Sequence, residues 1–276
     1  MTETEETLID CHCHLADKDF IDDIDQVVAD AKEKGVGAAL VVATSASEFQ
    51  RVIDLADRYP DFILPCFGVH PVQGALTDEQ RCVTLQDLEE AVPWIEKYHD
   101  RLGAIGEVGL DFQPRICKTR ADKEVQKKVL IRQIELAKKF NLPLFLGPNQ
   151  GDQCSESGRL VFTVWETGTK SGRSVFRIWE TGSKSRRNVH SRSSGRPTIA
   201  LLKEQGASRV LLHAFDGKAS VAREGVMEGY FFSVPPSVIR SEQLVKQLPV
   251  EALLLEQTLP LLDQIKSVCA EWSETI

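Results

Sequence analysis

Short apolar runs of strand length alternate with amphipathic helical segments along most of this 276-residue chain. Runs such as AALVVA at 38–43 are continuously apolar, as are strands covered on both faces of a parallel sheet. Segments such as residues 123–141 instead carry apolar residues at helical spacing. Because parallel strands need helical crossovers, eight alternating units predict an α/β fold of the TIM type, a (β/α)8 barrel. A doubly wound sheet is the alternative.

Residues 145–187 interrupt this alternation. They hold two similar stretches, RLVFTVWETGTKSG at 159–172 and RSVFRIWETGSKSR at 173–186, identical at 9 of 14 positions. Two copies are too few to build a stack of repeats. We therefore expect a single domain over 1–276, interrupted at about 145–187 by an insertion that does not pack. Its basic and aromatic residues leave a nucleic-acid-binding hairpin as the alternative.

Composition limits the class of protein. The net charge of −8 argues against a broad basic surface that coats nucleic acid, although a local phosphate site is still possible. No apolar run approaches the ~18 residues of a membrane span, and the acidic N-terminus lacks a secretory signal. Seven scattered cysteines favour reduced thiols. We expect a cytoplasmic, or else nuclear, protein with no membrane association and no stable protein partner.

Two histidines lie close together in LIDCHCHLAD at 8–17. Residues two apart in a strand point to the same face, so His12 and His14 should project together. Cys11 and Cys13 should face the opposite way, and their spacing is not that of a zinc-binding cysteine pair. The spacing therefore favours metal binding by the imidazoles and not by the thiols.

Further polar side chains end later apolar runs. Glu107, His190 and His213 each stand at the carboxyl end of an expected strand, where a parallel barrel builds its active site. Buried there, such groups would be costly unless they were paired or bound to metal. Five nitrogen and carboxylate donors, counting His12 and His14, are enough for two divalent metal cations, which would be zinc, manganese or magnesium.

Two more strand-end residues are candidates for other roles. His70 lies in GVHP at 68–71, where it could bind a metal or orient a substrate phosphate. Asp111 ends GEVGLD at 106–111, and we expect it to make a hydrogen bond to the site and not a metal bond.

These motifs resemble those of the TatD family of metal-dependent hydrolases, which are amidohydrolase-like barrels. The first family motif resembles Asp10-x-His12-x-His14. The next four resemble, in family order, GVHP at 68–71, GEVGLD at 106–111, HSR at 190–192 and HAFDG at 213–217. Within the family the motifs are most similar to an animal branch.

The resemblance implies a hydrolase of phosphoester bonds, a deoxyribonuclease with two divalent cations, acting on DNA or on a small phosphoester. His12 and His14 would hold one cation, His190 and His213 the other, and Glu107 would bridge them. The resemblance also implies catalytic roles for Glu107 and His70, and substrate contacts by His70, Asp111 and Arg192.

The end of the chain departs from the family pattern. The family's eighth strand ends in a motif like ETDSP, whose aspartate binds metal and acts as general base. Here LEQTLP places Thr258 at that position. A hydroxyl cannot accept a proton as a carboxylate does, and Glu256 and Asp263 are the nearby substitutes. The remaining residues suffice for one helix, so we expect an incomplete last β/α unit. The alternative function is therefore an impaired variant that binds metal or phosphate ligands without turnover.

Overall fold

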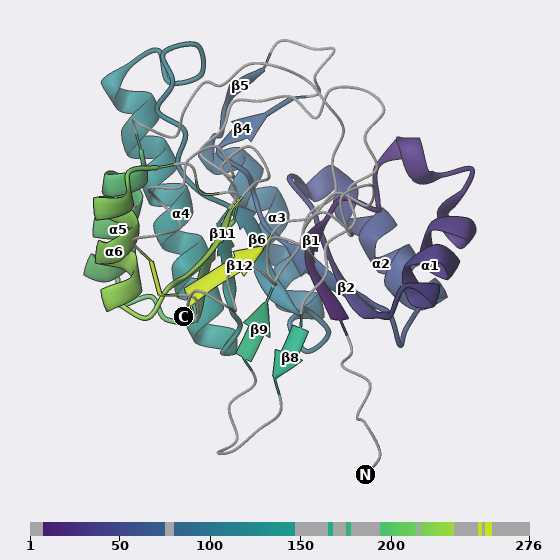
Figure 1. Cartoon of the computed structure of the whole chain (residues 1–276). Helices are drawn as coiled ribbons and strands as arrows, with labels where there is room; N and C mark the ends of the chain where they lie inside the picture. The colour runs from purple at the N-terminus through teal and green to yellow at the C-terminus, as the bar shows by residue number, and fades with distance from the viewer. Residues whose placement is uncertain are drawn as a thin grey trace.

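The computed structural model describes most of the chain. The described residues are 8–74, 80–146, 165–167, 175–177, 194–213, 215, 217–234, 248–249 and 252–255. Within them a curved sheet stands at the centre, with helices packed on its outer side (Figure 1). No helix in these ranges combines the length and apolarity that crossing a membrane requires.

Eight strands of the sheet run parallel, and each pairs with the next one of the set. In chain order they are β1 (Leu8–Cys13), β2 (Val36–Val42), β3 (Ile63–Phe67), β6 (Ala104–Val108), β7 (Leu144–Leu146), β10 (Val210–Leu212), β11 (Phe231–Val234) and β12 (Leu253–Leu255). All eight expected strands are present, and the prediction of a TIM-type α/β fold is confirmed. Residues 256–276, where we expect an incomplete last unit, lie outside the described residues.

The helices cover the outside of the sheet. They are α1 (Ile24–Glu33), α2 (Phe49–Arg58), α3 (Leu85–Tyr98), α4 (Arg120–Phe140), α5 (Gly195–Glu204) and α6 (Ala219–Met227), with short 3-10 turns η1 (Lys18–Phe20) and η2 (Ala46–Glu48). In α2, the apolar residues Phe49, Val52, Ile53 and Ala56 are buried, which is the helical spacing of an inward face. In Figure 1, α1 and α2 stand beside β1 and β2, whereas α5 and α6 stand at the opposite side.

Part of the unusual segment joins the sheet. Strands β8 (Trp165–Thr167) and β9 (Val175–Arg177) form an antiparallel hairpin, and β8 pairs with the edge strand β1 through Leu8 and Trp165. Strand β9 lies against β12, so the hairpin stands between the first and last parallel strands. The expectation that this segment does not pack is therefore wrong for these two strands. Its other residues after Leu146 lie outside the described ranges.

The fold brings one end of each strand to a common edge. Because the parallel strands all run the same way, the residues that end β1, β3, β6 and β10 meet at their carboxyl ends. A small antiparallel hairpin, β4 (Val72–Gln73) with β5 (Arg81–Cys82), stands above this edge (Figure 1). The side chains gathered there form the candidate site.

Candidate metal centre

Three buried side chains from three different strands converge at this edge. His12 lies on β1, Glu107 on β6, and His213 directly follows β10. One potential ligand atom of each lies within 4.8 Å of those of the other two. All three residues are buried, with exposed fractions of 0% for His12, 4% for Glu107 and 6% for His213. The structure thus gathers residues that are far apart in the sequence into one donor cluster.

His14 completes the group on the solvent side. Its Nε2 lies 3.3 Å from His12 Nε2 and 3.6 Å from Glu107 Oε2, while His12 Nε2 lies 3.5 Å from the same oxygen. The His14 side chain is 27% exposed, against 1% for that of His12. His12 also stacks on His213, with ring centroids 3.8 Å apart. His14 is therefore the most exposed of the four side chains, and the other three are buried.

The alternation of β1 sets this geometry. His12 and His14 point into the cluster, whereas the thiol of Cys13 points the other way and donates to Leu40 O at 3.5 Å. Asp10, itself buried, accepts a hydrogen bond from the backbone N–H of His12 at 3.0 Å. The strand therefore separates the imidazoles from the sulfur, as period-two alternation requires.

Burial and charge set the protonation states. Burial by itself would raise the pKa of Glu107, but the attraction of His12, His70 and His14 outweighs it and holds that pKa well below its usual range. Burial, together with repulsion from His213, lowers the pKa of His12 to about 4, and burial also lowers the pKa of His14. Lowered pKa values let both the carboxyl and the imidazoles give up their protons readily, which metal binding requires.

This donor set fits a divalent cation. Imidazole nitrogens and a carboxylate oxygen suit zinc and manganese, and the carboxylate also suits magnesium. Burying histidines and an ionised carboxylate together costs free energy unless they bind a partner such as a metal ion. The fit therefore rests on the chemistry and the spacing of the described side chains.

His70 and Asp111 lie beside the cluster. His70 follows β3, and its Nε2 lies 3.7 Å from Glu107 Oε1 while its Nδ1 contacts the backbone of Val72. Asp111 is 2% exposed, and its Oδ1 accepts from the backbone N–H of Gln113 at 2.8 Å. Burial raises the pKa of Asp111, against the opposing effects of Gln113 and His70. Asp111 Oδ2 has no hydrogen-bond partner among the described residues.

Several candidates from the sequence lie outside the described residues. They are His190, Arg192, Glu256, Thr258 and Asp263. The described cluster thus covers His12, His14, Glu107 and His213, and it leaves the His190 side of the expected two-cation site without a structural account.

Buried glutamines around the site escaped the sequence analysis. Gln126 and Gln133 are both 0% exposed on α4, and Gln73 on β4 is 6% exposed. In the sequence the two α4 glutamines stand in register with apolar residues such as Leu130 and Ile134. The sequence did contain a signal for them, namely two amides on an otherwise apolar helix face. Buried polar groups require hydrogen-bond partners, so such amides indicate a specific contact.

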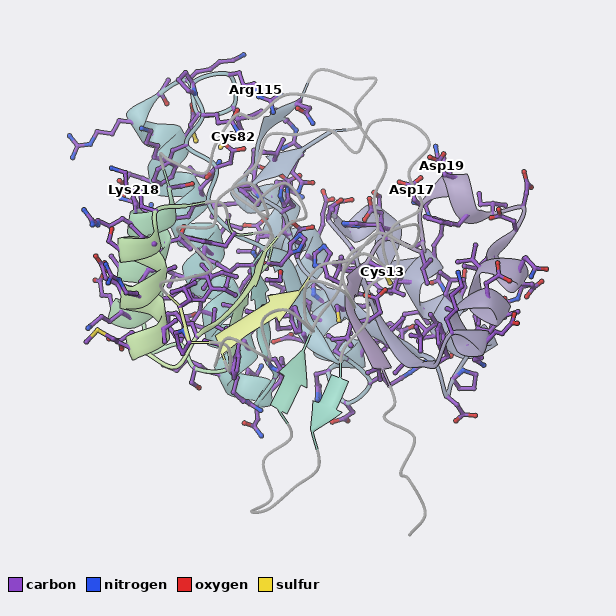
Figure 2. The ribbon with its side chains drawn as sticks, in the orientation of Figure 1. Cys13, Asp17, Asp19, Cys82, Arg115 and Lys218 are labelled. Atoms are coloured by element: carbon purple, nitrogen blue, oxygen red, sulfur yellow. The ribbon has the colours of Figure 1, made fainter. Side chains whose placement is uncertain are left out.

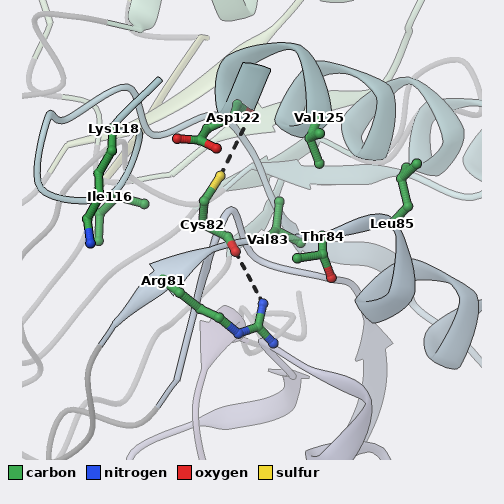
Figure 3. Close-up of a pocket in the computed structure, with 9 residues that line it drawn as sticks. All are labelled: Arg81, Cys82, Val83, Thr84, Leu85, Ile116, Lys118, Asp122 and Val125. Carbon is green, nitrogen blue, oxygen red and sulfur yellow. Dashed lines mark hydrogen bonds between the residues drawn. The ribbon is translucent and has the colours of Figure 1, made fainter. Parts of the chain in front are cut away.

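A cavity beside the β4–β5 hairpin lies apart from the cluster. This cavity of about 430 Å³ is bounded by β5, the loop before α4 and the starts of α3 and α4, and Figure 3 shows its lining. Its lining includes the polar side chains of Arg81, Thr84, Lys118 and Asp122, and none of the predicted site residues lines it. Arg115, labelled in Figure 2, donates to Gln80 Oε1 at 3.0 Å. This cavity therefore borders the candidate site without forming part of it.

Comparison with known proteins gives consistent matches. The family described as TatD related DNase matches residues 9–150 and 184–271. The human protein named Deoxyribonuclease TATDN3 is 49% identical over 273 residues, which is 98% of this chain and 84% of that protein. The uncharacterized metal-dependent hydrolase YabD of Bacillus subtilis is 27% identical and spans 92% of this chain and 81% of its own.

Solved structures give the same picture. The TatD homologue YjjV from Escherichia coli superposes with a TM-score of 0.62 at 25% identity, over 90% of this chain and 78% of that one. A hydrolase of the TatD family from Entamoeba histolytica also has a TM-score of 0.62, at 22% identity over 91% of this chain and 73% of that one. The second likeness concerns the fold alone.

Proposed function

Because this chain belongs to the TatD related DNase family of metal-dependent hydrolases, we propose that it hydrolyses phosphodiester bonds in DNA with the help of divalent cations. The observation that carries the proposal is the buried cluster of His12, Glu107 and His213, with its ligand atoms within 4.8 Å of one another. The names of the relatives, among them the human deoxyribonuclease, support DNA as the substrate. A small phosphoester is the alternative substrate.

The proposed roles of the residues are those that the family motifs imply. We assign His12 and His14 to one cation, His190 and His213 to a second, and Glu107 to both. A pair of bound cations polarises a phosphoryl oxygen, lowers the pKa of bound water and stabilises the leaving oxygen. Glu107 keeps its charge inside the protein because His12, His70 and His14 hold its pKa low.

His70, Asp111 and Arg192 are assigned to the substrate. The His70 Nε2 lies 3.7 Å from Glu107 Oε1, which supports a place for His70 beside a substrate phosphate at the cluster. There it can donate a proton or a hydrogen bond to a phosphate oxygen. Asp111, whose pKa is raised by burial, can hold its neighbours in place or accept a hydrogen bond from substrate.

A second candidate function rests on Thr258. The aspartate expected near the end of the eighth strand is replaced by threonine in LEQTLP. Losing a positioned general base typically lowers a rate by ~10²–10⁴-fold. A protein that binds metal and phosphate without turnover is therefore the alternative.

One experiment distinguishes the two functions. Metal-free protein is reloaded with Mn²⁺, Mg²⁺ or Zn²⁺, its metal content is measured, and end-labelled single- and double-stranded DNA is offered. We expect cation-dependent cleavage that His12→Asn abolishes and that the control His99→Asn, at the end of α3, leaves unchanged. Metal binding without cleavage by the wild-type protein would refute the nuclease proposal and favour the second function. Thr258→Asp should then restore cleavage.

The described cysteines bear on where the protein works. Cys13, Cys66, Cys82 and Cys117 are all free thiols, and Cys82 Sγ lies 4.0 Å from Cys117 Sγ without a bond. Free thiols at this spacing support a reducing compartment. We place the protein in the cytoplasm or the nucleus on that ground.

A further inference from the structure

Helix α4 carries two glutamines that are fully buried. Gln126 and Gln133 are 0% exposed and stand seven residues apart. Seven residues are about two turns of helix, so both side chains lie on one face and are spaced by ~10.5 Å along the axis. A leucine would fill either place in the core without needing hydrogen bonds, so two amides there require an explanation.

Each amide bonds to the backbone of one residue through both its oxygen and its nitrogen, and Gln126 Nε2 also lies 3.4 Å from Pro71 O and from Cys82 Sγ. Gln133 Oε1 accepts from the N–H of Val69 at 2.7 Å, and its Nε2 donates to the C=O of Val69 at 3.1 Å. Gln126 Oε1 accepts from the N–H of Asp111 at 2.8 Å, and its Nε2 donates to the C=O of Asp111 at 2.9 Å. The two glutamines therefore make the same paired contact with two different loops.

Val69 and Asp111, which accept and donate these hydrogen bonds, lie just beyond the ends of two strands. β3 ends at Phe67 and β6 at Val108, so Val69 and Asp111 both follow the last strand residue of their unit. Beyond its last strand residue a chain no longer has the regular ladder to fix it, and buried N–H and C=O groups must find other partners. The glutamine amides supply those partners from a single rigid helix.

Both loops carry groups of the candidate site. Val69 directly precedes His70, whose Nε2 lies 3.7 Å from Glu107 Oε1. Asp111 is itself a candidate residue, 2% exposed, and its Oδ2 has no hydrogen-bond partner among the described residues. The same helix therefore fixes both members of this pair relative to the metal cluster.

We propose that Gln133 and Gln126 are positioning residues for hydrolysis, which act through His70 and Asp111 respectively. The inference rests on the proposed function. A catalytic group that is misplaced by about 1 Å can lower a rate by ~10²-fold, so a loosened strand-end loop affects catalysis before it affects metal binding. The proposed cation ligands His12 and Glu107 lie within strands β1 and β6, where the sheet supports them.

Substitution of the two glutamines by methionine tests the role of these hydrogen bonds. Gln133→Met and Gln126→Met preserve side-chain length and remove both hydrogen bonds. We expect kcat on DNA to fall by ~10–100-fold, with KM and the affinity for Mn²⁺ changed by less than ~3-fold. Leu130→Ala is the matched control, because it creates a cavity in the same helix between the two glutamines. It should lower stability and leave the kcat of the folded protein unchanged.

Double variants separate positioning from general loosening. If Gln133 acts through His70, Gln133→Met should have no further effect on kcat in a His70→Ala protein. Gln126→Met should likewise have none in an Asp111→Ala protein. The proposal would be overturned if each glutamine substitution lowered kcat as much in the His70→Ala or Asp111→Ala protein as in the wild-type protein. An unchanged kcat in the single glutamine variants would also overturn it. If Gln133→Met does not fold, Gln133→Glu takes its place, since its carboxyl can still accept from Val69 N–H.

A readout without turnover keeps this inference distinct from the proposed function. If the wild-type protein cleaves no DNA, the nuclease proposal fails, but the positioning can still be measured. The imidazole signals of His70 in nitrogen-15 NMR spectra should shift in Gln133→Met and stay in place in Leu130→Ala. Coincident His70 signals in Gln133→Met and wild type would refute the positioning role.

Discussion

Glu107 is the residue on which the cluster depends. One of its oxygens lies 3.5 Å from His12 Nε2 and 3.6 Å from His14 Nε2, and the other lies 3.7 Å from His70 Nε2. Its single negative charge thus faces three imidazoles inside the protein. Removing that charge takes away the one anionic donor of the described cluster.

We therefore predict that Glu107→Gln abolishes tight cation binding. The amide has nearly the same shape but carries no charge, and loss of a supporting partner of a metal ligand alone costs ~10–100-fold in affinity. The loss of a ligand should be at least as large. Calorimetric titration of the metal-free protein with Mn²⁺ measures it. Glu96→Gln, which removes an exposed carboxylate that pairs with Lys139, is the control and should bind as wild type does.

Gly68 is the second residue that constrains the site. A Cβ at this position would lie 2.5 Å from Gly106 C and 2.7 Å from Glu107 O, and both are backbone atoms. Only glycine lets the end of β3 approach the end of β6 so closely.

We predict that Gly68→Ala forces these strand ends apart. The overpacking should lower the free energy of unfolding by ~1–3 kcal/mol, and displacement of Glu107 should weaken Mn²⁺ binding. Urea unfolding and calorimetry measure the two effects. Gly195→Ala is the control, because its Cβ would meet Phe215 and Val221 at an ordinary 3.8 Å. A Gly68→Ala protein with wild-type affinity and stability would contradict the argument.

At the scale of elements, the start of α3 is tied to the β4–β5 hairpin. Asp87 Oδ2 accepts from the backbone N–H and the hydroxyl of Thr84, both at 2.7 Å, which completes a capping box. Arg81 on β5 donates to both oxygens of the same carboxylate, at 2.7 and 2.6 Å. Burial opposes ionisation, but Arg81 and Thr84 outweigh it and lower the pKa of Asp87 to about 2.

This carboxylate should stabilise the protein in a pH-dependent way. The folded pKa lies below the ordinary value of 3.8, so the stabilisation is complete above pH ~4 and is lost as the pH falls towards 2. We predict that Asp87→Asn costs ~1 kcal/mol at pH 7 and progressively less below pH 4. Urea unfolding at several pH values tests this. Asp122→Asn, which removes a capping box without an arginine at α4, should cost less at pH 7.

The elements differ in how far the sequence foretold them. All eight parallel strands were predicted, because continuous apolar runs between helical patterns are typical of strands covered on both faces. Helix α6 was missed: its nine residues include a glycine, Gly225, and its apolar pattern is short. The apolar residues of 241–249 also have helical spacing, but most of this segment falls outside the described residues. Periodicity needs length, so short elements escape it.

At the scale of the whole molecule, the β8–β9 hairpin stands between the two ends of the parallel sheet. It pairs with β1 through one pair of residues and lies against β12. In an eight-stranded barrel without a hairpin, the first and last strands would pair directly. The family match leaves out residues 151–183, which include both strands of the hairpin.

We predict that replacing 151–183 with a short Gly-Ser linker leaves the protein folded. β1 would lose little pairing, and β12 would be free to pair with β1. The free energy of unfolding should therefore equal or exceed that of the full chain. A second variant with a Gly-Ser linker of unchanged length separates the effect of loop length from that of the hairpin. Failure of both variants to fold would show that the hairpin is needed to close the sheet.

The sequence by itself determined the alternation of strands and helices, the direction of the strands, and the end of the sheet at which polar side chains would meet. These follow from local periodicity and from the right-handed crossovers of parallel strands, which act over a few tens of residues. The same-face projection of His12 and His14 is equally local. Their metal-binding role was a prediction from the sequence and is still a proposal.

Only the tertiary structure decided which distant groups touch. Three contacts join residues from separate units. His12 stacks on His213, Gly68 lies close to Glu107, and α4 hydrogen-bonds to Val69 and Asp111. Such contacts depend on strand register and on the placement of helices against the sheet. These are set by the packing of the whole core, which no local pattern records.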